Sequence, residues 1–415
     1  TVASTTGSAI GYKSTWNDKY LVMTGGIIKV TSESGTAYGV NTSAAVTMTG
    51  GKIESEDYGI YTDTNKEIRI GNDDGAVSIA SPEIIGGSYA LYGENGNGYA
   101  KFYDGVLRGG TKAYSDNMIA GTPEATSLHK EPSAEYDENC WLVDTEGYLS
   151  VNGVEYNSLA KAYAAITGDS GTIKVTKDIA IESAHQSSPT NKHIIFDLND
   201  HELTLAQPLP NGGTMTIVDD GEHHTGKLYN SSTQNTAVLN SGTLTIESGY
   251  IAGNYRTITN TNGSTLNING GQIESNGGIC IYSEGKSGNA TAVNITGGLI
   301  GGNATYGLYN SNSYVNVSIT GGQIKISRSG DTDAIYNGKI TIDATANATV
   351  LDIEGSGTTR AFKEASVTLN NGNVSVRNTG SDYARGTLRG TFVMNGGSIT
   401  VSSPSSNAYG LDETT

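Results

Sequence analysis

The residues best suited to metal chemistry lie together in one short segment, Asp219-Asp220-Gly221-Glu222-His223-His224. Carboxylates beside imidazoles can ligate a divalent cation, and histidine can also exchange a proton near neutral pH. The opposing interpretation is that Asp-Asp-Gly is ordinary turn chemistry, and the comparable segment Asn72-Asp73-Asp74-Gly75 has no histidine. We favour the turn and expect no resident cofactor, with Ca²⁺ as the alternative. The metal-binding candidates are Asp219, Asp220, Glu222, His223 and His224.

Tyrosines form a second set of candidates, in segments such as YGIY (58–61) and YGLY (306–309). In each such segment one tyrosine follows an inward aliphatic residue, so a period of two points its ring outward. Outward tyrosines on successive strands can stack on sugar faces or contact a partner protein. They can also stack on one another and stabilise the sheet, which is the interpretation we favour. The binding candidates are Tyr61, Tyr92, Tyr282, Tyr309 and Tyr336.

The elements that must position these residues are predicted by a ten-residue cassette. It has two apolar residues one apart, a corner whose second residue is always Gly, and a further aliphatic residue. Apolar and polar residues alternate with a period of two, which indicates strands, and Gly suits a corner because it accepts positive φ. The copies are LVMTGGIIKV (21–30), VTMTGGKIES (46–55), LTIESGYIAG (244–253), LNINGGQIES (266–275), VNITGGLIGG (293–302), VSITGGQIKI (317–326), VTLNNGNVSV (367–376) and FVMNGGSITV (392–401).

The spacing of the cassettes predicts the fold. Within the runs of cassettes, corner glycines lie 22 to 27 residues apart, as between Gly249, Gly271 and Gly298, and the gap of 50 between Gly322 and Gly372 would hold two turns. Such a period is too short for a propeller blade and lacks the helix of a helical repeat. It fits one coil of a parallel β-solenoid, in which each coil buries its apolar face against the next. We therefore predict an all-β, right-handed parallel β-helix, with any function in its variable loops.

One segment departs from the β pattern. Residues 157–168 predict a short helix, with Asn157 or Ser158 as N-cap, an apolar stripe that includes Tyr163 and Ile166, and Gly168 as the stop. A helix before a solenoid is suited to cap its open apolar end. We therefore divide the chain into a first solenoid at 1–115, a closing segment and linker at 116–146, and a second, helix-capped solenoid at 147–415.

Composition narrows the class of protein. The 415 residues include 56 Gly and only 7 Pro, and no apolar run reaches 18 residues, so we expect no insertion in a membrane. The net charge of −17 argues against nucleic acid or an anionic lipid surface as partner. The chain begins at Thr1 without a signal peptide, which suggests a processed or excised fragment whose first solenoid has lost its cap. We expect a monomer.

Two cysteines are too few for a disulfide framework. Cys280 takes the place that Gly59 and Gly307 hold in the tyrosine-containing segments. We therefore expect a packed free thiol at this position, and a bridge between Cys140 and Cys280 stays open as the alternative.

The helix followed by GTIKVTKDI and by coils such as TLTIESGYI and LNINGGQI resembles the right-handed parallel β-helix of the pectate-lyase-like superfamily. More narrowly, the repeats are similar to those of large surface proteins of Gram-positive bacteria. That resemblance implies an extracellular, cell-surface location. Because the superfamily includes lyases, glycosidases, adhesins and passive stalks, the resemblance does not choose among them.

Enzymes of that superfamily need clustered acidic residues with a basic residue, or paired Asp residues with His and an Arg-x-Lys element. The chain has no Arg-x-Lys element, and its outward cassette residues are mostly Thr, Asn and Ser. We therefore name no catalytic residue and expect a non-enzymatic spacer and adhesin for a polysaccharide or a host surface protein. The alternative is a polysaccharide lyase or glycoside hydrolase, with carboxylates converging in a cleft around residues 219–224.

Overall fold

The computed structural model divides the chain into two compact units. The first comprises Thr1–Gly147 and Val154–Lys161, and the second comprises Tyr148–Gly153 and Ala162–Thr415. The structure describes residues 1–16, 18–71, 81–103, 105–115, 118, 128–130, 140–143, 147–156, 158–181, 187–404 and 407–414, with the backbone alone for 128–130, 140–143 and 414. The segment 72–75, residue Asn157, the side chain of Cys140 and most of the 116–146 linker lie outside these residues. The domain limits drawn from the sequence stay a prediction.

The first unit holds two sheets of stacked parallel strands, with an antiparallel pair, β13 and β14, next to β11. The larger sheet comprises β1 (Val2–Ser4), β3 (Tyr20–Ser32), β5 (Ala45–Ser55), β7 (Glu67–Ile70), β8 (Glu83–Gly86), β10 (Tyr99–Phe102), β11 (Val106–Gly109), β13 (Leu128–Lys130) and β14 (Cys140–Val143). The smaller comprises β2 (Ala9–Ser14), β4 (Ala37–Thr42), β6 (Tyr58–Thr62), β9 (Tyr89–Gly93) and β12 (Lys112–Tyr114). A 3-10 turn, η1 (Glu94–Gly96), follows β9.

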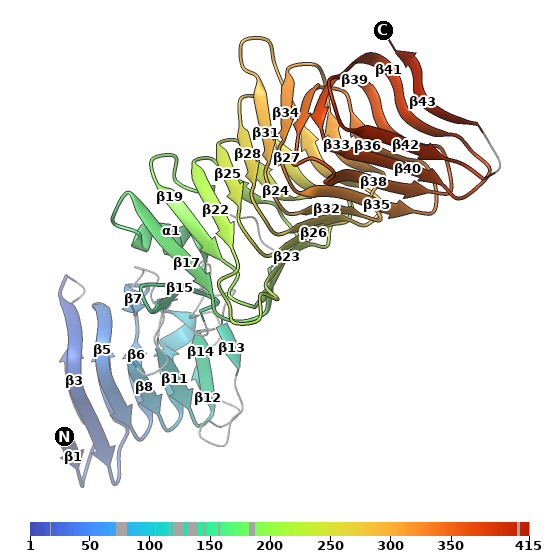
Figure 1. The fold of residues 1–415 in the computed structure, drawn as a ribbon. Coiled ribbons are helices and arrows are strands. Elements are labelled where there is room, and N and C mark those ends of the chain that lie inside the picture. The colour runs from blue at the N-terminus through green and yellow to red at the C-terminus, as the bar shows by residue number, and fades with distance from the viewer. Residues whose placement is uncertain are drawn as a thin grey trace. The chain divides into compact units, whose positions relative to one another are not determined.

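The second unit also has two sheets, a long one and a ten-stranded one that we call sheet D (Figure 1). The long sheet includes β15 (Leu149–Val151), β17 (Ser170–Val175), β19 (His193–Asp197), β21 (Leu209–Asn211), β22 (Thr214–Val218), β24 (Thr236–Asn240), β25 (Thr243–Ile246), β27 (Arg256–Asn260), β28 (Thr265–Ile268), β30 (Ile279–Ser283), β31 (Thr291–Ile295), β33 (Tyr306–Asn310), β34 (Val315–Ile319), β36 (Thr332–Tyr336), β37 (Lys339–Asp343), β39 (Thr359–Asn371), β41 (Ala384–Met394) and β43 (Ala408–Thr414).

Sheet D supplies one strand to each coil. Its strands are β18 (Ile179–Ile181), β20 (Glu202–Leu205), β23 (Lys227–Asn230), β26 (Tyr250–Gly253), β29 (Gln272–Ser275), β32 (Leu299–Gly302), β35 (Gln323–Arg328), β38 (Thr349–Gly355), β40 (Asn373–Asn378) and β42 (Ser398–Ser402). Along the chain, β16 (Val154–Tyr156) and α1 (Leu159–Ala165) precede β17.

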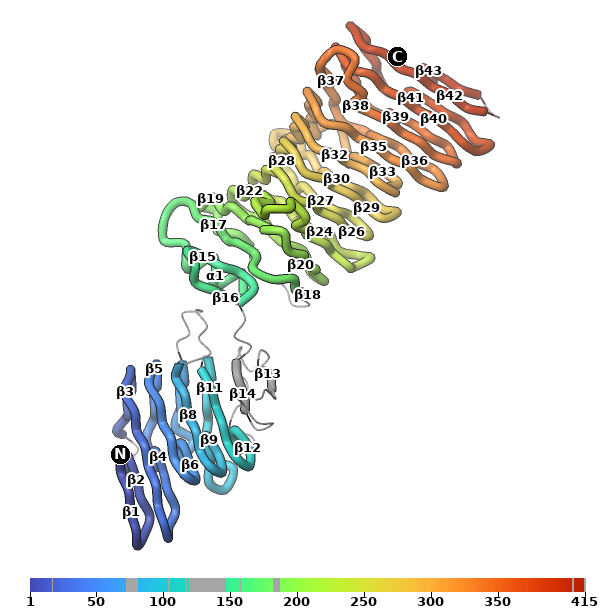
Figure 2. The backbone as a smooth tube through the Cα atoms, turned by 60° about the horizontal axis from the view of Figure 1, so that its bottom comes forward, coloured from blue at the N-terminus to red at the C-terminus, as the bar shows by residue number. Residues whose placement is uncertain are grey.

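The architecture is an all-β parallel solenoid of about 14 turns, which confirms the fold class predicted from the cassettes. The tube through the Cα atoms shows successive coils of the second unit lying one on another (Figure 2). Equivalent residues pair from coil to coil, as in Leu244↔Leu266 and Leu266↔Val293. Parallel pairing in constant register therefore brings each cassette position into a column.

The columns of inward residues form the core. In the six interior cassette copies, the three predicted inward residues are all at most 2% exposed. The terminal copies are less well covered: Leu21 is half-buried and Met394 is 48% exposed. The reason at the C-terminal end is that β43 pairs with β41 only as far as Gly390. Met394 pairs with the buried Leu369 and so continues the inward column, but no described strand covers it.

The cap was predicted correctly in outline. The Ser158 hydroxyl accepts a hydrogen bond from the Lys161 backbone N–H at 3.3 Å, which is N-cap geometry. α1 has only 7 residues. Ile166 just beyond it lies against Gly171, where an added Cβ would stand 2.8 Å from the Ile166 side chain. The end of the helix thus packs on the first coil of the second unit.

Among the described residues, no helix is both long and apolar enough to cross a membrane.

A buried polar ladder runs beside the core of the second unit and was not predicted. The Asn211 side chain donates to Asn240 Oδ1 at 2.9 Å, Asn240 donates to Asn260 Oδ1 at 3.0 Å, and Asn260 donates to Ser283 Oγ at 3.3 Å. Asn240 Oδ1 also accepts from the Gly242 backbone N–H. The Gly213 N–H likewise donates to Asn211 Oδ1 at 3.2 Å. Because buried amides must be satisfied, the ladder fixes the turns that follow Asn211 and Asn240.

All eight corner glycines have positive φ, between +69° and +111°. At Gly298 (φ +78°) an added Cβ would stand 2.6 Å from the Gly270 carbonyl oxygen of the preceding coil. Gly288 (φ +76°) lies in a loop with no atom within 4 Å of such a Cβ. The corner glycine is therefore required twice, for its backbone conformation and for the close approach of the neighbouring coil.

These two glycines give a matched test of coil stacking. Both Gly→Ala substitutions cost about 1 kcal/mol for the left-handed conformation. We expect Gly298→Ala to cost about 1–3 kcal/mol more, since the methyl group overlaps backbone that cannot move without parting the coils. Urea unfolding followed by circular dichroism measures both. Equal midpoints for the two variants would contradict the close approach.

Candidate functional site

Within the predicted metal segment, the Asp219 carboxylate binds backbone N–H groups. Asp219 is fully buried, and its two carboxylate oxygens accept hydrogen bonds from the backbone N–H groups of Asp200 at 2.8 Å and Gly226 at 2.7 Å. The Asp220 N–H donates to Asp197 Oδ1 at 3.0 Å. The His224 ring is 2.8 Å from the Asp219 carbonyl. These hydrogen bonds hold the backbone in place at a corner of the coil.

The remaining candidates of that segment point to solvent. The side chains of Asp220, Glu222, His223 and His224 are exposed. In the part of the chain that the structure describes, no three His, Cys, Asp or Glu side chains are grouped so that they could hold a metal ion. The structure does not bring the five metal candidates together, and metal binding by them stays a prediction.

The tyrosine candidates of the second unit form a column. The rings of Tyr282 and Tyr309 stack at 5.6 Å, and those of Tyr309 and Tyr336 stack at 4.6 Å. The Arg256 guanidinium lies 3.6 Å from the Tyr282 ring centroid at one end, and Lys363 Nζ lies 5.3 Å from that of Tyr336 at the other. The column thus runs over five coils, with a cation–π contact at each end.

The first unit holds a related cluster with two rows. Tyr61 and Tyr92 stack at 5.6 Å. Tyr58 stacks on Tyr38 at 5.5 Å and on Tyr89 at 6.2 Å, and rings of the two rows meet edge to face. The aliphatic residues before the tyrosine candidates, such as Ile60 and Leu308, are fully buried as predicted.

Stacking decides what the second-unit column can do. Tyr309 has a ring on each face, and the outer rings are covered by the two cations, so a sugar ring finds no free face there. Aromatic pairs contribute about 0.5–1.5 kcal/mol each beyond the area they bury. The geometry favours the structural interpretation for Tyr282, Tyr309 and Tyr336, while ligand binding by the five tyrosines stays untested.

Cys280 behaves as the sequence predicts. It is a free cysteine, fully buried, and its Sγ lies 3.2 Å from the Gly301 carbonyl oxygen. Burial raises the pKa of the thiol far above its usual range. A thiol that stays protonated is a poor nucleophile.

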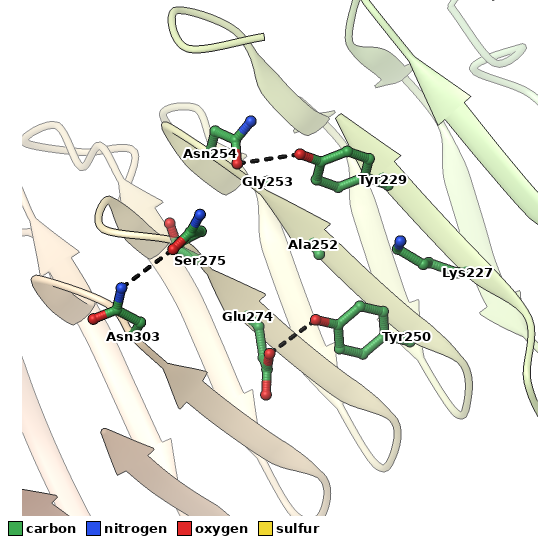
Figure 3. Close-up of a pocket in the computed structure, with 10 residues that line it drawn as sticks. Lys227, Tyr229, Tyr250, Ala252, Gly253, Asn254, Glu274, Ser275 and Asn303 are labelled. Carbon is green, nitrogen blue, oxygen red and sulfur yellow. Dashed lines mark hydrogen bonds between the residues drawn. The ribbon is translucent and has the colours of Figure 1, made fainter. Parts of the chain in front are cut away.

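A hollow of about 370 Å³ lies on the outer face of sheet D (Figure 3). The register of the strands in sheet D explains why the hollow forms. Tyr229, Ala252, Glu274 and Gly301 follow one another in a single outward column. Because Ala252 is small, a gap of two strand spacings, about 10 Å, opens between Tyr229 and Glu274. Tyr250 stands in the adjacent column.

Polar side chains surround this hollow. The Tyr229 hydroxyl donates to Asn254 Oδ1 at 3.2 Å, and the Tyr250 hydroxyl donates to Glu274 Oε2 at 2.8 Å. Figure 3 shows Ala252 between the two rings, each of which directs its hydroxyl towards its partner. The lining residues are Lys227, Tyr229, Tyr250, Ala252, Gly253, Asn254, Glu274, Ser275, Asn276 and Asn303.

Tyr250 and Lys227 determine much of the polar character of the hollow. Burial raises the pKa of Tyr250, and its hydrogen bond to Glu274 raises that pKa further, so the phenol remains a donor. Lys227 Nζ lies 3.2 Å from Glu202 Oε1 and 4.7 Å from the Tyr229 ring centroid. The hollow therefore offers rings, amides, one carboxylate and one ammonium group that already has a partner.

Sequence reasoning missed this hollow because its residues come from four coils and occupy different cassette positions. The one available signal was the replacement of a bulky outward residue by Ala252 and Gly301 in the copies on either side of Glu274. Such small residues can be recognised as the floor of a hollow only when the register of the strands is known.

Fold and site together define a parallel β-solenoid with a shallow, aromatic and polar hollow on one outer sheet. No family model, no curated protein and no solved structure matches the chain. What the chain does must therefore be argued from the hollow itself.

The tyrosine column predicts a stability difference between two substitutions. Tyr309→Leu removes both stacked contacts, and we expect a loss of about 1–3 kcal/mol. Tyr309→Phe keeps the ring and should stay within about 0.5 kcal/mol of the parent chain. Denaturant unfolding compares them. Equal losses for the two variants would mean that stacking does not stabilise the coils.

The same column predicts alkaline sensitivity. Burial, together with a hydrogen bond from its hydroxyl to Glu364, raises the pKa of Tyr336 from about 10 to about 12. Between these values the unfolded chain releases a proton that the folded chain retains, so stability falls as the pH rises from about 10 to about 12. Unfolding midpoints across this range should fall less steeply in Tyr336→Phe, which has no phenol at this position. Parallel pH profiles would contradict the prediction.

Proposed function

We propose that this chain is a non-enzymatic module of an extracellular surface protein of a Gram-positive bacterium, which serves as a rigid spacer and binds glycan. The observation that carries glycan binding is the hollow between Tyr229 and Glu274. Rings that present apolar faces beside hydroxyl and amide groups suit a pyranose, which has an apolar face and a rim of hydroxyls. The location rests on the resemblance of the repeats.

The spacer role is supported by continuous strand pairing. The ten strands of sheet D stack without interruption over about 45 Å at ordinary strand spacing. Each coil is tied to the next by backbone hydrogen bonds and by apolar columns, and the asparagine ladder adds side-chain bonds between the coils that carry Asn211, Asn240, Asn260 and Ser283. Bending such a unit would break several of these contacts at once.

The hydrolase or lyase alternative has less support. Acid–base cleavage of a glycosidic bond uses two carboxyl groups across the sugar, whereas Glu274 is the one carboxylate lining the hollow. The segment around Asp219, where the alternative placed a cleft, forms a hydrogen-bonded corner instead. We therefore propose binding without turnover.

A glycan array tests this function, with Ala252→Leu as the informative variant. The leucine fills the floor of the hollow and leaves Tyr229, Tyr250 and Glu274 in place, so we expect at least a tenfold loss of affinity for any glycan that the parent chain binds. Thr400→Leu adds the same exposed side chain to the same column on β42 and serves as the control. Circular dichroism checks that both variants fold.

Three outcomes would contradict the proposal. The array could stay blank for the parent chain, Ala252→Leu could bind as well as Thr400→Leu, or reducing ends could accumulate when the chain is incubated with the bound glycan. The last result would favour the enzymatic alternative.

A further inference from the structure

We infer that the hollow on sheet D selects an uncharged sugar and rejects a uronate. The inference rests on the proposed glycan-binding function and names the chemical class of its ligand. It is carried by the positions of charged groups along one face of sheet D, where Glu274 accepts side-chain hydrogen bonds from neutral donors and Lys227 has a carboxylate partner.

Glu274 supplies a fixed negative charge to the hollow. Its carboxylate accepts hydrogen bonds from the Tyr250 hydroxyl at 2.8 Å and from Gln272 Nε2 at 2.5 Å. Both donors are neutral, so they orient the carboxylate without cancelling its charge. Carboxylate oxygens accept about four hydrogen bonds between them, which leaves places for the hydroxyl groups of a sugar.

The lysine of the hollow is already paired. Lys227 contacts Glu202 at 3.2 Å. On the far side of this pair, Asp178, Ala180, Glu202 and Thr204 line a second hollow of about 320 Å³. Along the two hollows, one ammonium group therefore stands among three carboxylates, those of Asp178, Glu202 and Glu274.

Two further cations, Lys325 and Arg328, lie beyond the lining of the hollow. Lys325, two strands beyond Glu274 in the same column, lies 3.9 Å from the Asp352 carboxylate. Arg328 donates to the Asn303 carbonyl oxygen at 3.1 Å. A sugar carboxylate entering the hollow would meet Glu274 at short range, with no unpaired cation in the lining to offset the repulsion.

An uncharged pyranose meets complementary groups instead. Asn254 donates to the Ser231 carbonyl oxygen at 3.0 Å and accepts from the Tyr229 hydroxyl, so its amide keeps one N–H and one lone pair. Asn303 donates to Asn276 Oδ1 at 3.2 Å, which leaves the Asn303 oxygen as an acceptor. Hydroxyl groups, as donors and acceptors, can satisfy these positions, while the sugar's apolar face covers a tyrosine ring.

The test compares sugars that differ only in charge. Isothermal titration uses β-1,4-linked tetramers of glucose and of mannose, each beside the same tetramer oxidised at C6 to the uronate. We expect the neutral member of the bound pair to bind at least about tenfold more tightly, and the ratio to shrink at high salt, because exposed charges are screened.

Two variants assign the selectivity to named charges. In Glu274→Gln the affinity ratio of neutral to acidic tetramer should fall towards one, since the amide can still accept from Tyr250 without repelling a carboxylate. In Lys227→Met the ratio should not fall, because Lys227 is committed to Glu202. Circular dichroism confirms folding of each variant.

The outcomes separate the inference from the function on which it rests. Equal or tighter binding of a uronate tetramer overturns charge selection but leaves glycan binding intact. A ratio unchanged in Glu274→Gln overturns the role of this carboxylate. Absence of binding by all four tetramers, together with a blank glycan array, overturns both the proposed function and the inference.

Discussion

The constraint on which the structure depends is the parallel stacking of coils in constant register. Each backbone segment hydrogen-bonds to its equivalent in the next coil, so every side chain lies beside the same position of its neighbours. Inside, this produces columns of Ile, Leu and Val. At the corners it brings the backbone so close that an added Cβ at Gly322 would stand 2.3 Å from the Gly297 carbonyl oxygen. On the outside, it lines up outward side chains in columns, and each column either repeats one residue type or changes from one type to another.

Surface columns that repeat one residue stabilise the fold, whereas columns that change residue form the candidate binding site. Where a column repeats the same ring, as at Tyr282, Tyr309 and Tyr336, the faces cover one another and the column strengthens the stack. Where the column changes residue, as from Tyr229 to Ala252 to Glu274, a gap opens and side chains of different chemistry face it. We therefore place the candidate binding site where a surface column changes residue type.

Much of the scaffold was predictable because equivalent positions of a repeated sequence pattern pair with one another when the coils stack. The cassette identified the strands, the inward residues and the corner glycines, and the position of Cys280 predicted a buried thiol. The asparagine ladder could have been found as well, since Asn211, Asn240 and Asn260 each follow an inward aliphatic residue by two positions. The hollow could not, because Tyr229 and Asn303 come to line one hollow only when four coils are stacked. Asp219 looked like a ligand because its backbone partners are invisible in sequence.

The central claim is that ligand recognition lies in the interrupted column of sheet D and not in the tyrosine column. A crystal structure of the chain soaked with a mixture of neutral and acidic oligosaccharides tests it most directly. The account predicts electron density for a neutral sugar ring over Ala252, between Tyr229 and Glu274. Density on Tyr282–Tyr309–Tyr336 with an empty hollow would contradict it.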